Sequence, residues 1–276
     1  MIEHLEKPKF ILDPEVAHDL ASACEVTPAQ VIERTLAGLK PCGLLKSRRV
    51  AEHPLWRDGL SALLRRPTSD PVLPMMNSKF GGIPYDEGSA WAGYSFLGQL
   101  NFSQFNAKPL GFPDDGILGI DMGAELFDFR IRWYPSPDKK RAKAVTVPSV
   151  GHYECAISYF PEWSLPTTDT EFLELYAGFP QDALDVLIDW LPEQIAMDDG
   201  GHRLGGWRAA GLFDHYEFSP PSGTPANLDD WTMVLRLDFD NQADFGWGSN
   251  VIYVIAPTDD FQKHDFSRAF VVGANF

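Results

Sequence analysis

The feature that most constrains the fold is a pattern of glycines and strand-like runs that occurs twice in the chain. A glycine pair, an apolar run, a polar loop and a second apolar run follow one another in each half. The glycine pairs are Gly81-Gly82 and Gly205-Gly206, and the runs are 96–102 with 115–119 and 234–239 with 249–253. Because adjacent glycines permit tight turns with positive φ, the repeated strand–loop–strand unit predicts an internal duplication. Two similar halves also predict a groove between them, a common place for a binding site.

The rest of this region favours an α+β fold with a mixed, largely antiparallel sheet. The 22 prolines and 23 glycines indicate many turns rather than a helical bundle. Residues 127–134 alternate apolar and polar side chains, and residues 153–160 also have strand character. Residues 170–191 predict a helix that breaks at Gly178-Phe179-Pro180, and we expect an irregular tail after residue 256.

A helical segment is predicted ahead of this body, over residues 1–66. Asp13-Pro14 and Thr27-Pro28 are helix start signals, and Gln30 stands where a capping box requires it. Pro41 and Gly43 should end the second helix, and a third is expected over residues 54–64. The sequence thus predicts a helical segment over residues 1–66 and an α+β domain over residues 67–276.

The acidic charge of the chain is concentrated towards its end. The formal net charge is −16, and residues 181–276 hold sixteen acidic but only five basic residues, a net charge of −11. Such a field repels nucleic acid and anionic lipid and attracts cationic partners. We therefore expect neither a nucleic-acid nor a membrane partner. An acidic surface is also an ordinary route to solubility.

Neither metal sites nor disulfides are predicted. The three cysteines, Cys24, Cys42 and Cys155, are widely spaced and include no C-x-x-C pair. The run from Asp238 to Asp244 lacks the glycine and glutamate of a calcium loop, and the glycine pairs lack phosphate-loop spacing. We expect no cofactor. The first residues lack the apolar core of a signal peptide, and no apolar run reaches membrane length, so we expect a cytoplasmic location.

Several motifs in order carry a resemblance to a known family. They are residues 79–84, the runs 96–102 and 235–239, the segment 202–206, and Gly246-Trp247-Gly248. With these motifs the chain resembles the YwqG-like family, a bacterial domain family of unknown function, over about residues 70–276. The resemblance implies an α+β body. Where the family has Trp-Gly-Asp, this chain has Ser249 in place of the acid. Some relatives are thought to lie beside bacterial toxin genes, which implies an immunity role.

Two functions from different classes are expected. The leading hypothesis is a non-enzymatic, protein-binding immunity protein that neutralises a cationic, nuclease-like toxin by filling its basic cleft. Acidic residues and aromatic anchors would contact the partner. These candidates are Asp198, Asp199, Asp229, Asp230, Asp240, Asp244, Trp231 and Trp247.

The alternative is a small-molecule-binding protein or an uncharacterised enzyme that uses the groove between the halves. If the two glycine turns face each other, Lys79, His202 and Arg203 would form a small cationic pocket in an acidic protein. Against this, Lys79 and Arg203 could simply pair with neighbouring carboxylates. No catalytic residue is predicted, because Cys155 and its neighbour His152 would point to opposite faces of a strand.

Overall fold

The computed structural model describes twelve parts of the chain, and the account below concerns these parts only. They are residues 7, 12–23, 25–52, 73–124, 128–143, 145, 147–150, 153–165, 170–194, 202–207, 220–245 and 250–275. The strands are β1 (Lys40–Glu52), β2 (Lys79–Phe80), β3 (Ser95–Asn101), β4 (Ile117–Met122), β5 (Phe129–Tyr134), β6 (Tyr153–Ser164), β7 (His202–Leu204), β8 (Trp231–Leu237), β9 (Asn250–Pro257) and β10 (Phe270–Asn275). The α-helices are α1 (Pro14–Ala23), α2 (Pro28–Gly38), α4 (Thr170–Leu175), α5 (Gln181–Gln194) and α6 (Thr258–Gln262), and the 3-10 turns are η3 (Phe102–Gln104), η4 (Lys108–Leu110) and η5 (Leu228–Asp230).

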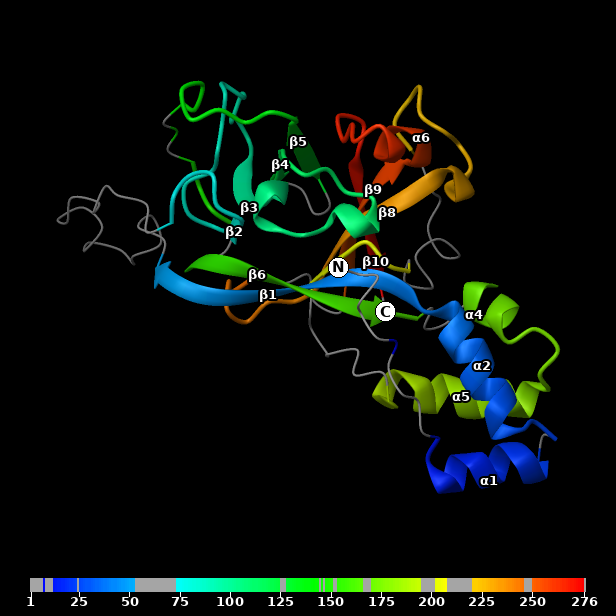
Figure 1. Ribbon diagram of the computed structural model, residues 1–276. Coiled ribbons are helices and arrows are strands. Elements are labelled where there is room, and N and C mark those ends of the chain that lie inside the picture. Colours follow the sequence, from blue (N-terminus) through cyan, green and yellow to red (C-terminus); the bar gives the residue numbers. More distant parts are fainter. Residues whose placement is uncertain are drawn as a thin grey trace.

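All the described strands belong to one antiparallel sheet. Their order is β10-β9-β8-β7-β1-β6-β2-β3-β4-β5. The two longest strands, β1 and β6, pair along their whole length at the centre of the sheet, where they run side by side in Figure 1. On each side of this centre lie a short strand and then three longer ones. The α+β class and the largely antiparallel sheet expected from the sequence are confirmed.

The two sides of the sheet match in detail as well as in order. Short strands β2 and β7 pair with β6 and β1, respectively, and each runs into a glycine pair with positive φ. The N–H of Gly81 donates to Leu97 at 2.9 Å, and the N–H of Gly205 donates to Val234 at 3.0 Å. The ladders β3–β4 and β8–β9 both carry a register shift next to these acceptors. The halves are thus related by an approximate two-fold axis between β1 and β6, as an internal duplication would require.

The sheet curls strongly around one apolar core. Edge strands β5 and β10 come close together, so that the sheet nearly closes into a barrel. Phe80 from β2 and Leu204 from β7 lie in this core. Aromatic side chains from the loops that connect the strands, such as Phe112 and Phe266, fill it further. Among these, Phe266 packs edge-on against Trp133 of β5 with 4.8 Å between ring centroids. We call the face of the sheet that lines this core the inner face, and the opposite face the outer face.

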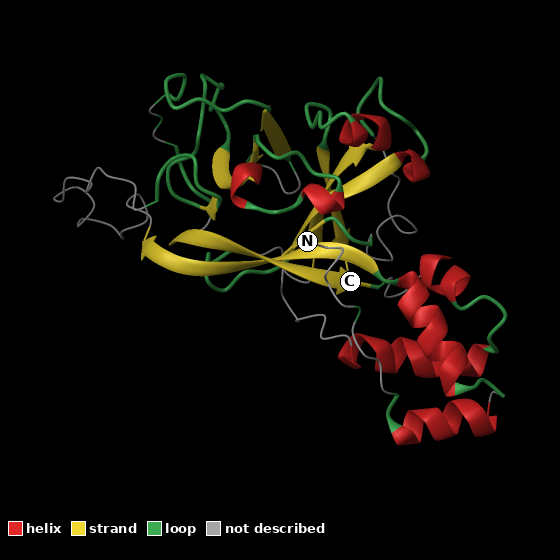
Figure 2. Ribbon diagram, in the orientation of Figure 1, coloured by secondary structure: helices red, strands yellow, loops and turns green. Residues whose placement is uncertain are grey.

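Among the described residues, helices α1, α2, α4 and α5 form a separate layer beside the sheet (Figure 2). They share a second apolar core, which includes Leu20, Val31, Tyr176 and Leu187. The predicted capping box at Thr27 is present, and the predicted break at 178–180 separates α4 from α5. A segment near the N-terminus and a segment from the second half of the sequence therefore build this layer together.

Two predictions about secondary structure are wrong. Residues 40–52, placed in the helical segment, form β1 instead, and the expected irregular tail contains β10. In β1, Leu44 and Leu45 are both buried, because strands flank it on both edges and both of its faces are partly covered. That arrangement removes the alternation by which a strand is recognised. The expected helix at 54–64 and the boundary at residues 66–67 lie outside the described residues.

Candidate functional site

The three residues expected to form a cationic pocket do not converge. Lys79 and Arg203 occupy equivalent places in the two halves, since each precedes a core residue and its glycine pair. Their neighbours Phe80 and Leu204 point to the inner face, so Lys79 and Arg203 point to the outer face. His202 lies on the inner face between the rings of Phe80 and Phe245. Strands β1 and β6 separate Lys79 from Arg203.

In the first half, the buried Lys79 has a carboxylate partner. Its Nζ lies 3.1 Å from Oε1 of Glu154, and both side chains are almost completely buried. The carbonyl oxygens of Leu73 and Pro74 accept two longer bonds from the same ammonium. Burial lowers the pKa of Lys79, and the Glu154 carboxylate opposes that effect. The pair is a neutral, self-contained unit.

At the outer edge of the first half, two arginines share one buried carboxylate. Arg132 makes a bidentate contact with Asp121, with Nε and Nη2 at 2.7 and 2.9 Å from its oxygens. Arg130 binds the same carboxylate at 2.7 Å. Although burial opposes it, the Asp121 carboxylate raises the pKa of Arg132. The carbonyl oxygen of Tyr85, from the loop after the first glycine pair, accepts a further bond from Arg132.

In the second half, the equivalent row of outer-face side chains consists of Arg203, Arg236 and Tyr253, and each has a buried polar atom without a partner among the described residues. Arg203 is 5% exposed, and its Nε has no hydrogen-bond partner among the described residues. Arg236 stands directly opposite it on β8; its Nη2 binds Asp238 at 2.8 Å, but its Nε also lacks a partner there. Tyr253 follows on β9, opposite Arg236, and its buried hydroxyl has no partner within the described parts either.

Tyr253 and the neighbouring Cys42 are neutral. Burial raises the pKa of Tyr253 to about 12, although the two arginines act in the opposite direction. Burial likewise raises the pKa of the Cys42 thiol to about 12, against the influence of Arg203. Both groups are therefore protonated at neutral pH and offer no negative charge. Two carboxylates lie beside these groups: Asp238 is bound to Arg236, and Glu162 lies across Cys42 on β6 and raises the pKa of its thiol further.

His202 has both ring nitrogens engaged. Its Nδ1 accepts from the N–H of Asp238 at 3.2 Å, so its Nε2 carries the hydrogen and donates to Asp240 at 2.9 Å. Burial tends to raise the pKa of Asp240, but bonds from His202, Ser47 and a backbone N–H lower it to about 2. This pair fixes the turn after β8 against the central strands.

The acidic residues expected to contact a partner fall into three groups. Asp229, Asp230 and Asp244 are exposed. Asp240 and Trp231 are buried, and so neither is presented to a partner in this structure. Asp240 is buried because it follows the end of β8 and turns inward to His202. The remaining candidates, Asp198, Asp199 and Trp247, lie outside the described residues.

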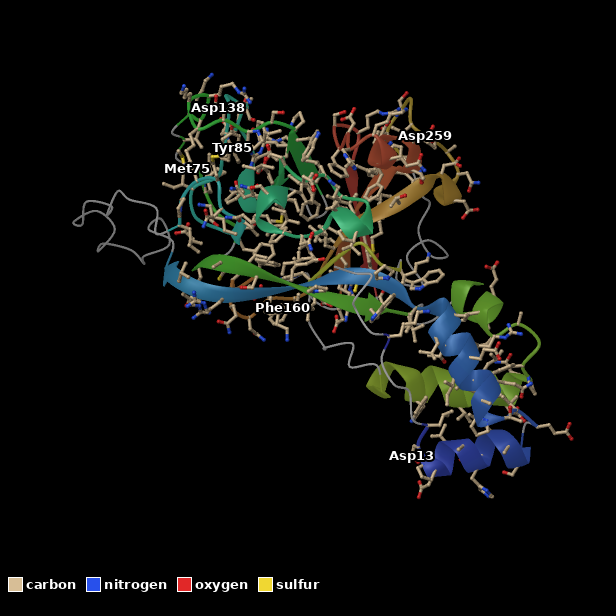
Figure 3. The ribbon with its side chains drawn as sticks, in the orientation of Figure 1. Asp13, Met75, Tyr85, Asp138, Phe160 and Asp259 are labelled. Carbon is tan, nitrogen blue, oxygen red and sulfur yellow. The ribbon has the colours of Figure 1, made fainter. Side chains whose placement is uncertain are left out.

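Exposed carboxylates gather at one corner of the second half. Asp229 and Asp230 lie in η5 just before β8, and Asp259 lies in α6 just after β9. Pairing of Trp231 with Pro257 brings these two segments together, and a bond of 3.0 Å joins Thr232 to Thr258. Asp259 projects at the end of the molecule that carries α6 (Figure 3). We call Asp229, Asp230, Asp259 and the nearby Asp265 the acidic corner.

Sequence reasoning missed Arg236, Tyr253 and Cys42. Arg236 stands between two leucines in a strand that reads as half-solvated, so its charge looked exposed. A signal was present, since Arg236 and Gln99 occupy equivalent places in the two repeats. Within the described residues, no group of three or more histidine, cysteine, aspartate or glutamate side chains could hold a metal ion. No helix in those parts is both long and apolar enough to span a bilayer.

Comparison with protein-family models places this chain in a known family. A family model described as a domain of unknown function (DUF1963) matches residues 51–273. This range begins within β1 and ends within β10, so it contains both similar halves and the helices α4 and α5. None of the curated proteins matches this chain.

Proposed function

Because this chain belongs to the DUF1963 family, a family of unknown function, we propose a function from its surface chemistry. In this proposal the protein is a non-enzymatic module that binds a cationic protein, and the acidic corner is its contact surface. The observation that carries this proposal is the meeting of Asp229 and Asp230 with Asp259 at the paired ends of β8 and β9.

The carboxylates of the corner lie at the surface. Asp229, Asp230, Asp259 and Asp265 are exposed. Hydrogen bonds from the Ser267 backbone and side chain lower the pKa of Asp265, so it is fully ionised at neutral pH. The arginine of this region, Arg268, is already bound to the buried Asp260, with two contacts of 2.6 Å. The corner therefore keeps a net negative charge, which speeds the approach of a basic protein.

A bacterial toxin is the partner we propose, and neutralisation in the cytoplasm is the role. An immunity protein must bind quickly and cover a basic, nucleic-acid-binding cleft, and concentrated carboxylates suit both demands. The resemblance to YwqG-like proteins supports the same role. The pocket of Lys79, His202 and Arg203, expected as an alternative, is not proposed, because β1 and β6 separate Lys79 from Arg203 and His202 lies on the opposite face of the sheet.

Co-expression with the product of the neighbouring open reading frame tests the proposal. We expect that product to stop growth alone, to be harmless with this chain, and to bind it with an association rate that falls as NaCl rises. The triple variant Asp229→Lys/Asp230→Lys/Asp259→Lys should slow association about tenfold or more.

A matched control carries the same charge change on the helical layer, in Asp19→Lys/Glu33→Lys/Asp182→Lys, where all three residues are exposed. It should protect like the unaltered chain. If the neighbouring product is harmless by itself and does not bind, the immunity role is wrong. If both triple variants lose binding equally, the acidic corner is not the contact surface.

A further inference from the structure

The two-fold relation between the halves identifies a buried cation, Arg203, whose Nε has no partner among the described residues. Lys79 and Arg203 are equivalent, and Lys79 is neutralised by Glu154. A Cβ on Gly82 would lie 2.5 Å from Glu154, and a Cβ on Gly206 would lie 2.9 Å from Cys42. The register gives the same match, since Phe80 pairs with Cys155 and Leu204 pairs with Gly43, so that Glu154 and Cys42 each precede the equivalent partner. A protonated thiol there cannot balance the charge of Arg203.

A second cation makes the imbalance larger. Arg203 and Arg236 face each other directly across the β7–β8 ladder, an arrangement in which like charges repel. Asp238 neutralises one of them. The neighbouring Tyr253 belongs to a buried apolar cluster with Trp231 and Met233, and such surroundings strengthen any charge interaction. An isolated buried charge is costly, so a negative group beside this pair would stabilise it.

We propose that Arg203, Arg236 and Tyr253 bind a small oxyanion, a phosphate or a carboxylate, on the outer face of the second half. The unpartnered donors fit such a ligand: the Nε hydrogens of two guanidinium groups and one hydroxyl hydrogen come from three adjacent strands. A planar guanidinium presents parallel N–H groups that match the two oxygens of these anions. This site is separate from the acidic corner and does not depend on the proposed function.

Thermal unfolding of the full chain, with free anions as probes, tests the site. Sodium phosphate and sodium citrate should each raise Tm above that in NaCl of equal ionic strength, in a saturable way. Comparison of the two anions tells whether phosphate or carboxylate is preferred. Arg203→Gln should raise the half-saturating anion concentration about tenfold or more, because it removes the main charge-assisted donors. Arg48→Gln, which removes an exposed arginine of β1, is the matched control and should leave it unchanged.

Two further variants keep the test decisive if Arg203→Gln does not fold. Tyr253→Phe removes a hydroxyl that has no partner and keeps the ring, so the fold should survive while anion affinity falls several-fold. Cys42→Glu restores the carboxylate at the place equivalent to Glu154 and should abolish the anion effect. The proposal is overturned if neither anion exceeds NaCl, or if Tyr253→Phe and Cys42→Glu respond to phosphate as the unaltered chain does.

Discussion

At the scale of single residues, buried polar groups show how this fold handles charge. Lys79 is matched by Glu154, Arg132 by Asp121, and His202 by Asp240. Each pair joins different strands or a strand and a turn, so each specifies one arrangement of the chain as well as a local contact. Substituting one member would leave the other buried without that partner, which lowers the free energy of unfolding by more than the intact pair contributes to it.

The Asp240 pair predicts a defined dependence of stability on pH. The pKa of Asp240 falls from its ordinary 3.8 to about 2 in the folded protein. The carboxylate therefore stabilises the fold by about 2 kcal/mol above pH 4, and this stabilisation is lost as the pH falls through 2. Asp240→Asn should cost roughly this amount at pH 7 in urea unfolding, and the difference from the unaltered chain should shrink between pH 4 and pH 2.

The exposed Asp230 supplies the control. Asp230→Asn should change stability by less than about 0.5 kcal/mol at either pH, as is usual for surface substitutions. A deficit in Asp240→Asn that stays constant from pH 7 to pH 2 would mean that the carboxylate charge is not what holds the turn.

At the scale of elements, the glycine turn after β2 sets the geometry of the first half. Gly81 has φ of 62°, and a Cβ there would collide with the backbone oxygen of Tyr153. Gly81→Ala should therefore destabilise the protein by at least about 3 kcal/mol, from left-handed strain and the clash together. Gly93 has φ of 83° with open space around it. Gly93→Ala should cost only about 1–2 kcal/mol, the strain alone. Equal losses of Tm in the two variants would contradict this account.

Elements with a local signal could be predicted from the sequence. Helix α2 has its capping box, and β5 alternates along 129–134. Strands β1 and β7 could not, because their identity depends on neighbours that are distant in the sequence. β7 has three residues, too few for any periodicity. The glycine pairs were recognised as turns, but which face each neighbouring cation occupies follows only from the sheet register.

At the scale of the whole molecule, the sheet depends on residues that precede the predicted domain boundary. β1 lies between β6 and β7 and joins the two halves. A chain that starts at residue 67 lacks β1, so we expect it not to fold, with no cooperative transition on heating. A chain that starts at residue 40 keeps every described strand but loses α1 and α2. It should retain the circular dichroism of the sheet and unfold at a lower temperature, since the helical core is incomplete.

Full stability of the chain that starts at residue 67 would show that β1 is dispensable. The duplication itself could be predicted, because both copies keep the order of glycine pair and runs. The imbalance at Arg203 could not, since it depends on a comparison between Cys42 and Glu154. These residues have no resemblance in sequence and become equivalent only in three dimensions.

The central place of β1 has a consequence for how the chain is made. During translation β1 is synthesised early, whereas its partners β6 and β7 begin only at residues 153 and 202. Pairing over such separations is slow, and the nascent strand waits with both edges open to other chains. Three exposed cations on β1, Lys46, Arg48 and Arg49, oppose pairing with another copy during that interval. The basic side chains of β1 thus disfavour aggregation of the nascent chain until β6 and β7 have been synthesised.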